Sequence, residues 1–246
     1  MTSTNSSPQQ LEPDPLEPTP DQVERYVAAL QDLAARDPEL ARRQAWAQIR
    51  LAGARAGSRR KEAHDTLNRI FRLGGPPEPP LEGPMRGILV TPITAALTDP
   101  LMRALSSSWM PWVGKRFDGA SQTGDNLLTR SARIPAKGLW PRYRLEDAGD
   151  GRLAAFKFRT YVEPGKVDPD VDALKIDYDS DENPGLLIRD ILDELVQVVP
   201  GAYLGKVLLR RKDGWRLVGY FALQPPETVS AEEPVAEVPE PVPAPA

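Results

Sequence analysis

The feature that most constrains the fold is a nearly continuous apolar run close to the C-terminal end, residues 195–223, LVQVVPGAYLGKVLLRRKDGWRLVGYFAL. Pro200-Gly201 divides it once, and Asp213-Gly214, the strongest hairpin signal in the chain, divides it again. We therefore predict three consecutive antiparallel strands. The last two are apolar on both faces, so their sheet must be covered on the outside as well as the inside.

Upstream, residues 151–165 and 172–179 alternate apolar and polar side chains with the period of a β-strand. In the first segment one face is expected to carry Ala154, Phe156, Phe158, Thr160 and Val162, and the other Leu153, Ala155, Lys157, Arg159 and Tyr161. Several short strands that end in a meander predict a barrel or a strongly curved sheet.

The preceding segment, residues 19–73, has helical spacing instead. Thr19 and Gln22 form a capping box around Pro20, a second helix begins after Asp37, and a third follows Ser58. Each helix has one apolar stripe, so we predict that these helices, with a short one near residues 99–107, cover the outer face of the sheet.

The predicted fold class is therefore α+β, with a Pro/Gly linker at residues 74–83 and a β-barrel domain at residues 84–224.

Both ends of the chain contain few apolar side chains that could pack into a core. Residues 1–18 and the Pro/Glu-rich residues 225–246 are predicted to be disordered, and the second is read as a solubilising end rather than a docking strand. No targeting signal or apolar run long enough to span a bilayer is found, which makes the cytoplasm the default location.

Charge is unevenly distributed although the net charge is only −4. Residues 41–72 hold nine Lys or Arg against two acids. Because these cations surround the helices without an aromatic platform or a DNA-reading motif, we predict a solvated face and no nucleic-acid partner. An acidic protein partner, or the chain's own acidic tail, is the alternative.

The composition limits the available chemistry. The chain has no cysteine and a single histidine, His64, which we expect on the surface. A transition-metal or haem site then has too few ligands, and Ser/His/Asp catalysis has no suitable base. Residues 177–188 depart from the calcium-loop pattern at its glycine and glutamate positions. We therefore predict neither a metal nor a cofactor.

Residues 109–126, WMPWVGKRFDGASQTGDN, predict two strands around a Gly-rich turn. Trp112 and Phe117 are large enough to plug or line one end of a barrel. Lys115 and Asp118 fall on opposite faces of the first strand and are both expected to behave as surface residues. Glu194, on an apolar strand face, is expected to pair with Arg159 or Lys206.

In their order, the segments GPMRG (83–87), WVGKRFD, KIDYD…NPG and YLGK…GYFAL resemble bacterial proteins that carry a GXWXG motif and an associated domain of unknown function. Met85 stands where the motif has tryptophan. More loosely, residues 83–223 are similar to calycins, the lipocalin and fatty-acid-binding-protein barrels. The resemblance implies a small calycin-like barrel that holds an apolar ligand, and it carries over no catalytic residue.

Three hypotheses remain open. The first is a non-enzymatic barrel that binds an apolar or lipid-like molecule, with Arg159 or Lys175 meeting a carboxylate. The second is a cofactor-independent isomerase or cyclase that uses Asp and Glu with a tyrosine donor. The third is an interaction protein with a packed barrel. The candidate ligand-binding residues are Trp112, Phe117, Trp140, Tyr143, Phe156, Phe158, Arg159, Lys175, Tyr178 and Glu194.

Overall fold

The computed structural model describes residues 18–91, 112–185 and 187–226. The short helix expected near residues 99–107 lies outside these ranges. So do nearly all of the two predicted tails. Among the described residues, no helix combines the length and the apolar character needed to cross a membrane.

Three helices open the described chain: α1 (Pro20–Ala34), α2 (Pro38–Ala54) and α3 (Arg60–Arg72), with a 3-10 turn at Arg55–Gly57. The capping box of Thr19 and Gln22 is present as predicted, and the Asp37 side chain accepts a hydrogen bond from the Leu40 N–H at the start of α2. These caps satisfy backbone N–H groups that have no partner inside a helix.

The remaining elements are mainly strands. Their bounds are β1 (Gly83–Leu89), β2 (Trp112–Asp118), β3 (Thr123–Thr129), β4 (Glu146–Gly149), β5 (Arg152–Pro164), β6 (Asp172–Asp177), β7 (Ile191–Val199), β8 (Ala202–Arg211) and β9 (Gly214–Gln224). A short helix α5 (Arg133–Leu139) follows a 3-10 turn at Arg130–Ala132, and another 3-10 turn covers Ile188–Asp190.

The strands form an antiparallel sheet in the order β3-β2-β1-β9-β8-β7-β6-β5-β4. Because β3 also pairs with β5, the sheet closes into an eight-stranded barrel, and β4 extends it beyond β5. The two predicted hairpins are confirmed: Val199 pairs with Ala202 and Arg211 with Gly214.

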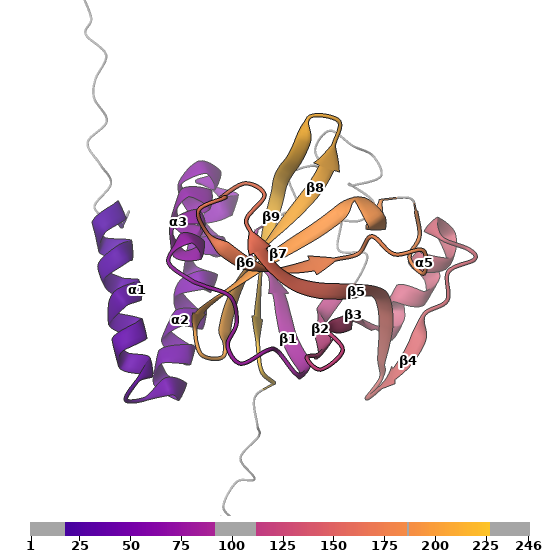
Figure 1. The fold of residues 1–246 in the computed structure, drawn as a ribbon, viewed down its shortest axis with the longest axis horizontal. Helices are drawn as coiled ribbons and strands as arrows, with labels where there is room; N and C mark the ends of the chain where they lie inside the picture. Colours follow the sequence, from indigo (N-terminus) through magenta and orange to yellow (C-terminus); the bar gives the residue numbers. More distant parts are fainter. Residues whose placement is uncertain (1–17, 92–111, 186, 227–246) are drawn as a thin grey trace, which may run out of the picture.

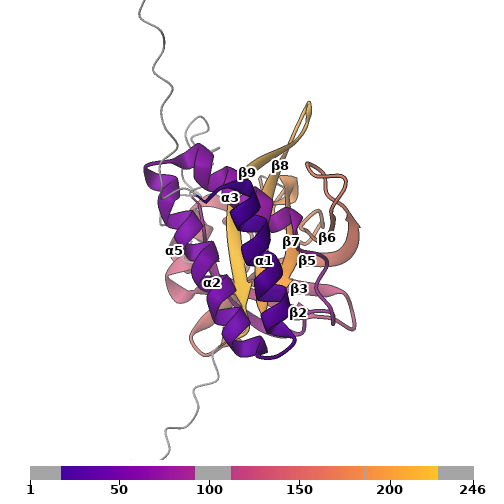
Figure 2. The ribbon, with the colours of Figure 1, turned by 90° about the vertical axis from the view of Figure 1, so that its left-hand side faces the viewer.

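Buried side chains form two cores. One lies inside the barrel and contains most of its aromatic residues. The other joins α1, α2 and α3 to the outer faces of β7, β8 and β9, through residues such as Ile49, Phe71 and Leu204. Figures 1 and 2 show the three helices gathered on one side of the barrel, with α5 and β4 at the opposite side in Figure 1. The prediction that helices cover the outer face of the last strands is confirmed.

Strand β5 departs from the predicted alternation. Leu153, Ala155, Phe156 and Phe158 all belong to the interior core, whereas strict alternation separates the first two from the last two. Phe156 has a positive φ of 52°, and the register of β5 against β3 shifts in the same region. Such a bulge lets neighbouring residues face the same side of a sheet, so the expectation of two opposite faces is wrong here.

Candidate functional site

A polar cluster lies inside the barrel. We call it the Lys115 cluster, and it consists of Trp112, Lys115, Asn126, Tyr178 and Asp193. Strands β2, β3 and β7 supply four of these residues, and Tyr178 directly follows β6. Alternation along β2 places Lys115 on the same face as Phe117, which belongs to the interior core.

Lys115 is 2% exposed, and its ammonium group has three oxygen partners. The Nζ atom donates to Asn126 Oδ1 at 2.9 Å, to Asp193 Oδ2 at 2.9 Å and to the Tyr178 hydroxyl. The Tyr178 hydroxyl in turn donates to Asp193 Oδ2 at 2.9 Å. The side chains of Lys115, Asn126, Tyr178 and Asp193 therefore share one hydrogen-bond network, in which the ammonium group has three oxygen partners.

Aromatic rings surround the same ammonium group. Its Nζ lies 5.1–5.5 Å from the ring centroids of Trp112, Phe158, Tyr178 and Phe221, a distance suited to cation–π attraction. Glycine makes room for two of these rings, because a Cβ at Gly87 would overlap the Trp112 ring and one at Gly205 would overlap the Phe221 ring.

One atom of the cluster lacks a partner. Asp193 Oδ1 is buried and makes no hydrogen bond to any described residue. An unpaired buried acceptor costs about 1–3 kcal/mol, so such atoms call for a specific explanation. Burial lowers the pKa of Lys115, against the opposing effect of Asp193, and burial raises the pKa of Tyr178 well above its usual value.

Two further lysines are buried on the outer face of the barrel wall. Lys175 pairs with Glu194 at 2.6 Å, and both side chains are fully buried. Lys206 bonds to Asp168 and, at 2.5 Å, to Asn68 Oδ1 of α3. Burial lowers the pKa of both lysines, against the hydrogen bonds of their carboxylate partners.

These outer contacts tie other segments to the barrel. The backbone N–H of Lys166 donates to Glu194 at 2.6 Å, and Arg72 of α3 bonds to Asp168 at 2.7 Å. The segment between β5 and β6 and helix α3 are thereby fastened to the wall. Glu194 Oε2 has no partner among the described residues.

Three expectations about individual residues are wrong. Lys115 is buried rather than on the surface, although Asp118 on the opposite face is exposed as predicted. Glu194 forms its ion pair with Lys175, which lies opposite it on β6, and not with Arg159 or Lys206; Lys206 also lies opposite Glu194, on β8, but its ammonium group bonds to Asp168. His64 is only partly exposed, since its ring packs edge-on against Tyr220.

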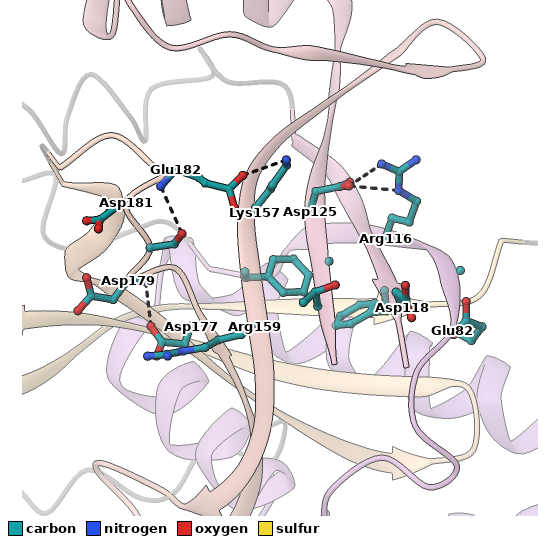
Figure 3. Close-up of a pocket in the computed structure, with 16 residues that line it drawn as sticks. Glu82, Arg116, Asp118, Asp125, Lys157, Arg159, Asp177, Asp179, Asp181 and Glu182 are labelled. Atoms are coloured by element: carbon teal, nitrogen blue, oxygen red, sulfur yellow. Dashed lines mark hydrogen bonds and ion pairs between the residues drawn. The ribbon is translucent and has the colours of Figure 1, made fainter. Parts of the chain in front are cut away.

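A charged pocket of about 910 Å³ opens on the outside of the barrel at β2, β3 and β5 (Figure 3). In it Arg116 lies 2.5 Å from Asp125, and Arg159 lies 2.8 Å from Asp177. Burial raises the pKa of Asp125, against its pairing with Arg116. The charged residues of its lining are Glu82, Arg116, Asp118, Asp125, Lys157, Arg159, Asp177, Asp179, Asp181 and Glu182.

The pocket and the Lys115 cluster share a boundary. Phe117 and Phe158 line the pocket and also belong to the interior core. Their ring centroids are 5.3 Å apart, and the Phe158 ring lies 5.5 Å from Lys115 Nζ. Two phenyl rings therefore lie between the outer pocket and the buried cluster.

The candidate residues fall into three places. All seven aromatic candidates contribute to the interior core: Trp112, Phe117, Trp140, Tyr143, Phe156, Phe158 and Tyr178. The Tyr143 ring stacks on Phe156, and the Tyr143 hydroxyl accepts a hydrogen bond from the Phe156 N–H. Arg159 lies at the charged pocket. Lys175 and Glu194 lie together on the outer face of the wall.

Sequence reasoning missed Lys115, Asn126 and Asp193 as a group. Two signals were present, because Lys115 shares its strand face with Phe117, and Asp193 shares its face with Ile191 and Leu195. Among the described residues, no three His, Asp or Glu side chains gather in a way that could hold a metal ion.

Comparisons with known proteins add little to this geometry. No family model and no curated protein matches the chain. A crystal structure of a protein from Thermomonospora curvata is similar over 67% of this chain and 87% of that one, with 17% sequence identity and a TM-score of 0.39.

Proposed function

We propose that the barrel binds a small organic molecule with an apolar body, and that Asp193 accepts a hydrogen bond from it. The observation that carries the proposal is Asp193 Oδ1, a buried carboxylate oxygen without a partner in the described part of the chain. A hydroxyl or amine of a ligand would satisfy this atom. The aromatic rings around the cluster offer apolar contact to the rest of the molecule.

A purely structural account explains the Lys115 cluster poorly. Removing two charges from water costs several kcal/mol per ion, and well-packed apolar side chains of similar volume often stabilise a protein as well or better. A barrel interior that serves only stability therefore has no need of Lys115 and Asp193. Titratable groups with shifted pKa values that converge in an enclosed site are more typical of function.

The charged pocket supplies a route of entry. A ligand that arrives there meets Phe117 and Phe158, which separate the pocket from Lys115. Displacement of these rings would bring a ligand from the pocket to Lys115. Arg159, at the pocket, is available to the carboxylate of an entering molecule only if it leaves Asp177.

Acid–base catalysis at the same cluster is the second candidate. Asp193 Oδ2 accepts hydrogen bonds from both Lys115 and Tyr178, so a proton can pass between these groups along existing contacts. This arrangement suits an isomerase or cyclase that needs neither a metal nor a histidine.

Two adjacent carboxylates provide the test. Asp193→Asn alters the interior cluster, whereas Glu194→Gln makes the matching change on the outer face. Protein purified from its own host should carry a small molecule in native mass spectrometry. Occupancy should fall about tenfold in Asp193→Asn, because a charged acceptor becomes a neutral one, and should be unchanged in Glu194→Gln. A wild type without ligand, or equal occupancy in both variants, would contradict the proposal.

A further inference from the structure

We propose that the molecule bound in the barrel carries an aldehyde or ketone group, and that Lys115 forms an imine with it. This inference rests on the proposed function, because it names the class of ligand at that same site. It is carried by the arrangement of an enclosed amine, a carboxylate with one oxygen that has no partner among the described residues, and a tyrosine hydroxyl, all in direct contact.

The first requirement is a neutral amine. Lys115 must lose a proton before its nitrogen can attack a carbonyl carbon, and Asp193 lies 2.9 Å away to receive it. The unpaired Oδ1 of Asp193 is free to hold that proton. Burial among apolar rings lowers the pKa of Lys115 and so favours its neutral amine, as in other lysines that act as nucleophiles.

The reaction balances with groups already present. The amine nitrogen of Lys115 adds to the carbonyl carbon and passes one of its own protons to the carbonyl oxygen, which gives a neutral carbinolamine. Asp193 then returns its proton to the carbinolamine hydroxyl, which leaves as water while the C=N bond forms. The net change is one ammonium plus one carbonyl compound giving one protonated imine plus one water, so no oxidant or reductant is needed.

The product suits the site as well as the ammonium does. A protonated imine keeps a single positive charge on the Lys115 nitrogen, which lies 5.1–5.5 Å from four ring centroids and beside the Asp193 carboxylate. An arginine could supply the charge but not this chemistry. Lys175 and Lys206 are equally buried and also paired with carboxylates, so they are internal controls.

Reductive trapping tests the inference. The full chain is incubated with octanal or benzaldehyde and sodium cyanoborohydride, which converts an imine into a stable secondary amine, and adducts are located by peptide mass mapping. We expect one adduct per chain at Lys115 and none at Lys175 or Lys206. Trapping at Lys115 should be lost in Lys115→Arg, slow about 10²-fold in Asp193→Asn, and be unchanged in Glu194→Gln.

A second measurement separates this inference from the proposed function. Native mass spectrometry without reductant reports whether octanal or benzaldehyde is retained at all. Retention without an adduct at Lys115 overturns the imine and leaves ligand binding intact. If the aldehyde is not retained and no adduct forms at Lys115, the imine is overturned. That result also weighs against the binding of such apolar molecules. Adducts confined to exposed lysines such as Lys157 or Lys212 also overturn the imine. If Lys115→Arg fails to fold, two other results test the imine: the position of the adduct in the wild type, and the slower trapping at Lys115 in Asp193→Asn.

Discussion

The barrel wall buries lysine–carboxylate pairs on both of its faces, and the two faces differ in what surrounds the pairs. On the inside, Lys115 and Asp193 come from β2 and β7, which are not neighbours in the sheet, and all their hydrogen bonds within the described chain go to side chains. On the outside, Glu194 lies opposite both Lys175 and Lys206 on adjacent strands and also holds the backbone N–H of Lys166.

This difference indicates that the outer pairs hold parts of the fold together, whereas the inner pair serves ligand binding. The outer pairs connect the wall to helix α3 and to the segment between β5 and β6, so they have a structural task that apolar side chains would not perform. In the described ranges the inner pair bonds to no segment outside the barrel, yet it brings two charges into a ring of aromatic side chains. We therefore expect the outer pairs to matter for stability and the inner pair for binding.

The largest expected effect is on the outer face. Asp168→Ala should lower the free energy of unfolding by about 3–5 kcal/mol, because it leaves Lys206 buried without its carboxylate. Asp170→Ala is the matched control, since Asp170 also bonds to Arg72 but is exposed, and it should cost no more than about 1 kcal/mol. Urea titration measures both. Equal small effects would show that the outer pairs do not fasten the fold.

Trp112→Ala should lower the free energy of unfolding by about 3 kcal/mol, the lower end of the range for a core tryptophan because Trp112 is partly exposed. It removes the ring that packs against Phe221 and the hydrogen bond to Asn126. Trp215→Ala near the β8–β9 turn is the control and should change stability by about 1 kcal/mol or less. A neutral Trp112→Ala would contradict its place in the interior core.

Stability should fall in acid partly through Asp168. Burial acts to raise the pKa of this carboxyl group, but its hydrogen bonds to Lys206 and Arg72 prevail and lower it below 3.8. The unfolded chain then binds more protons than the folded one in this range, so the contribution of Asp168 is complete above pH 3.8 and is lost as pH falls through the folded pKa. Between pH 7 and pH 3 the free energy of unfolding, measured by urea titration, should fall less in Asp168→Asn than in the wild type. An equal fall in both proteins would show that Asp168 is not linked to acid unfolding.

The smallest effect is expected at Asp118. Its side chain is exposed on the face of β2 opposite Lys115, and its main local contact is the Ser121 N–H in the following turn. Asp118→Ala should change the free energy of unfolding by less than about 1 kcal/mol. A larger loss in urea titration would mean that the β2–β3 turn stabilises the barrel more than its exposure suggests.

The sequence predicted the fold more fully than the site. Residues 195–223 predicted three strands and their two turns, because hairpin chemistry and alternation are local. Thr19 and Gln22 predicted the first helix for the same reason. Barrel closure between β3 and β5, and the bulge at Phe156, depend on pairing between distant segments and were not accessible from local patterns.

The site was harder to predict because its members meet across the barrel. Lys115 and Asp193 are 78 residues apart, and neither lies in a motif. Lys115 follows a glycine and precedes Arg116, so its local sequence predicts a surface residue. The aromatic candidates were easier to find, since large rings on an apolar strand face are expected inside a barrel.

The most direct test replaces each buried pair with apolar side chains of similar size and measures both unfolding in urea and bound small molecules in native mass spectrometry. Lys115→Met with Asp193→Leu should leave stability unchanged or raise it by about 1–4 kcal/mol, and should abolish the bound molecule. Lys175→Met with Glu194→Leu should keep the bound molecule. If the interior variant unfolds readily while retaining its ligand, the Lys115 cluster serves the fold and the central claim is wrong.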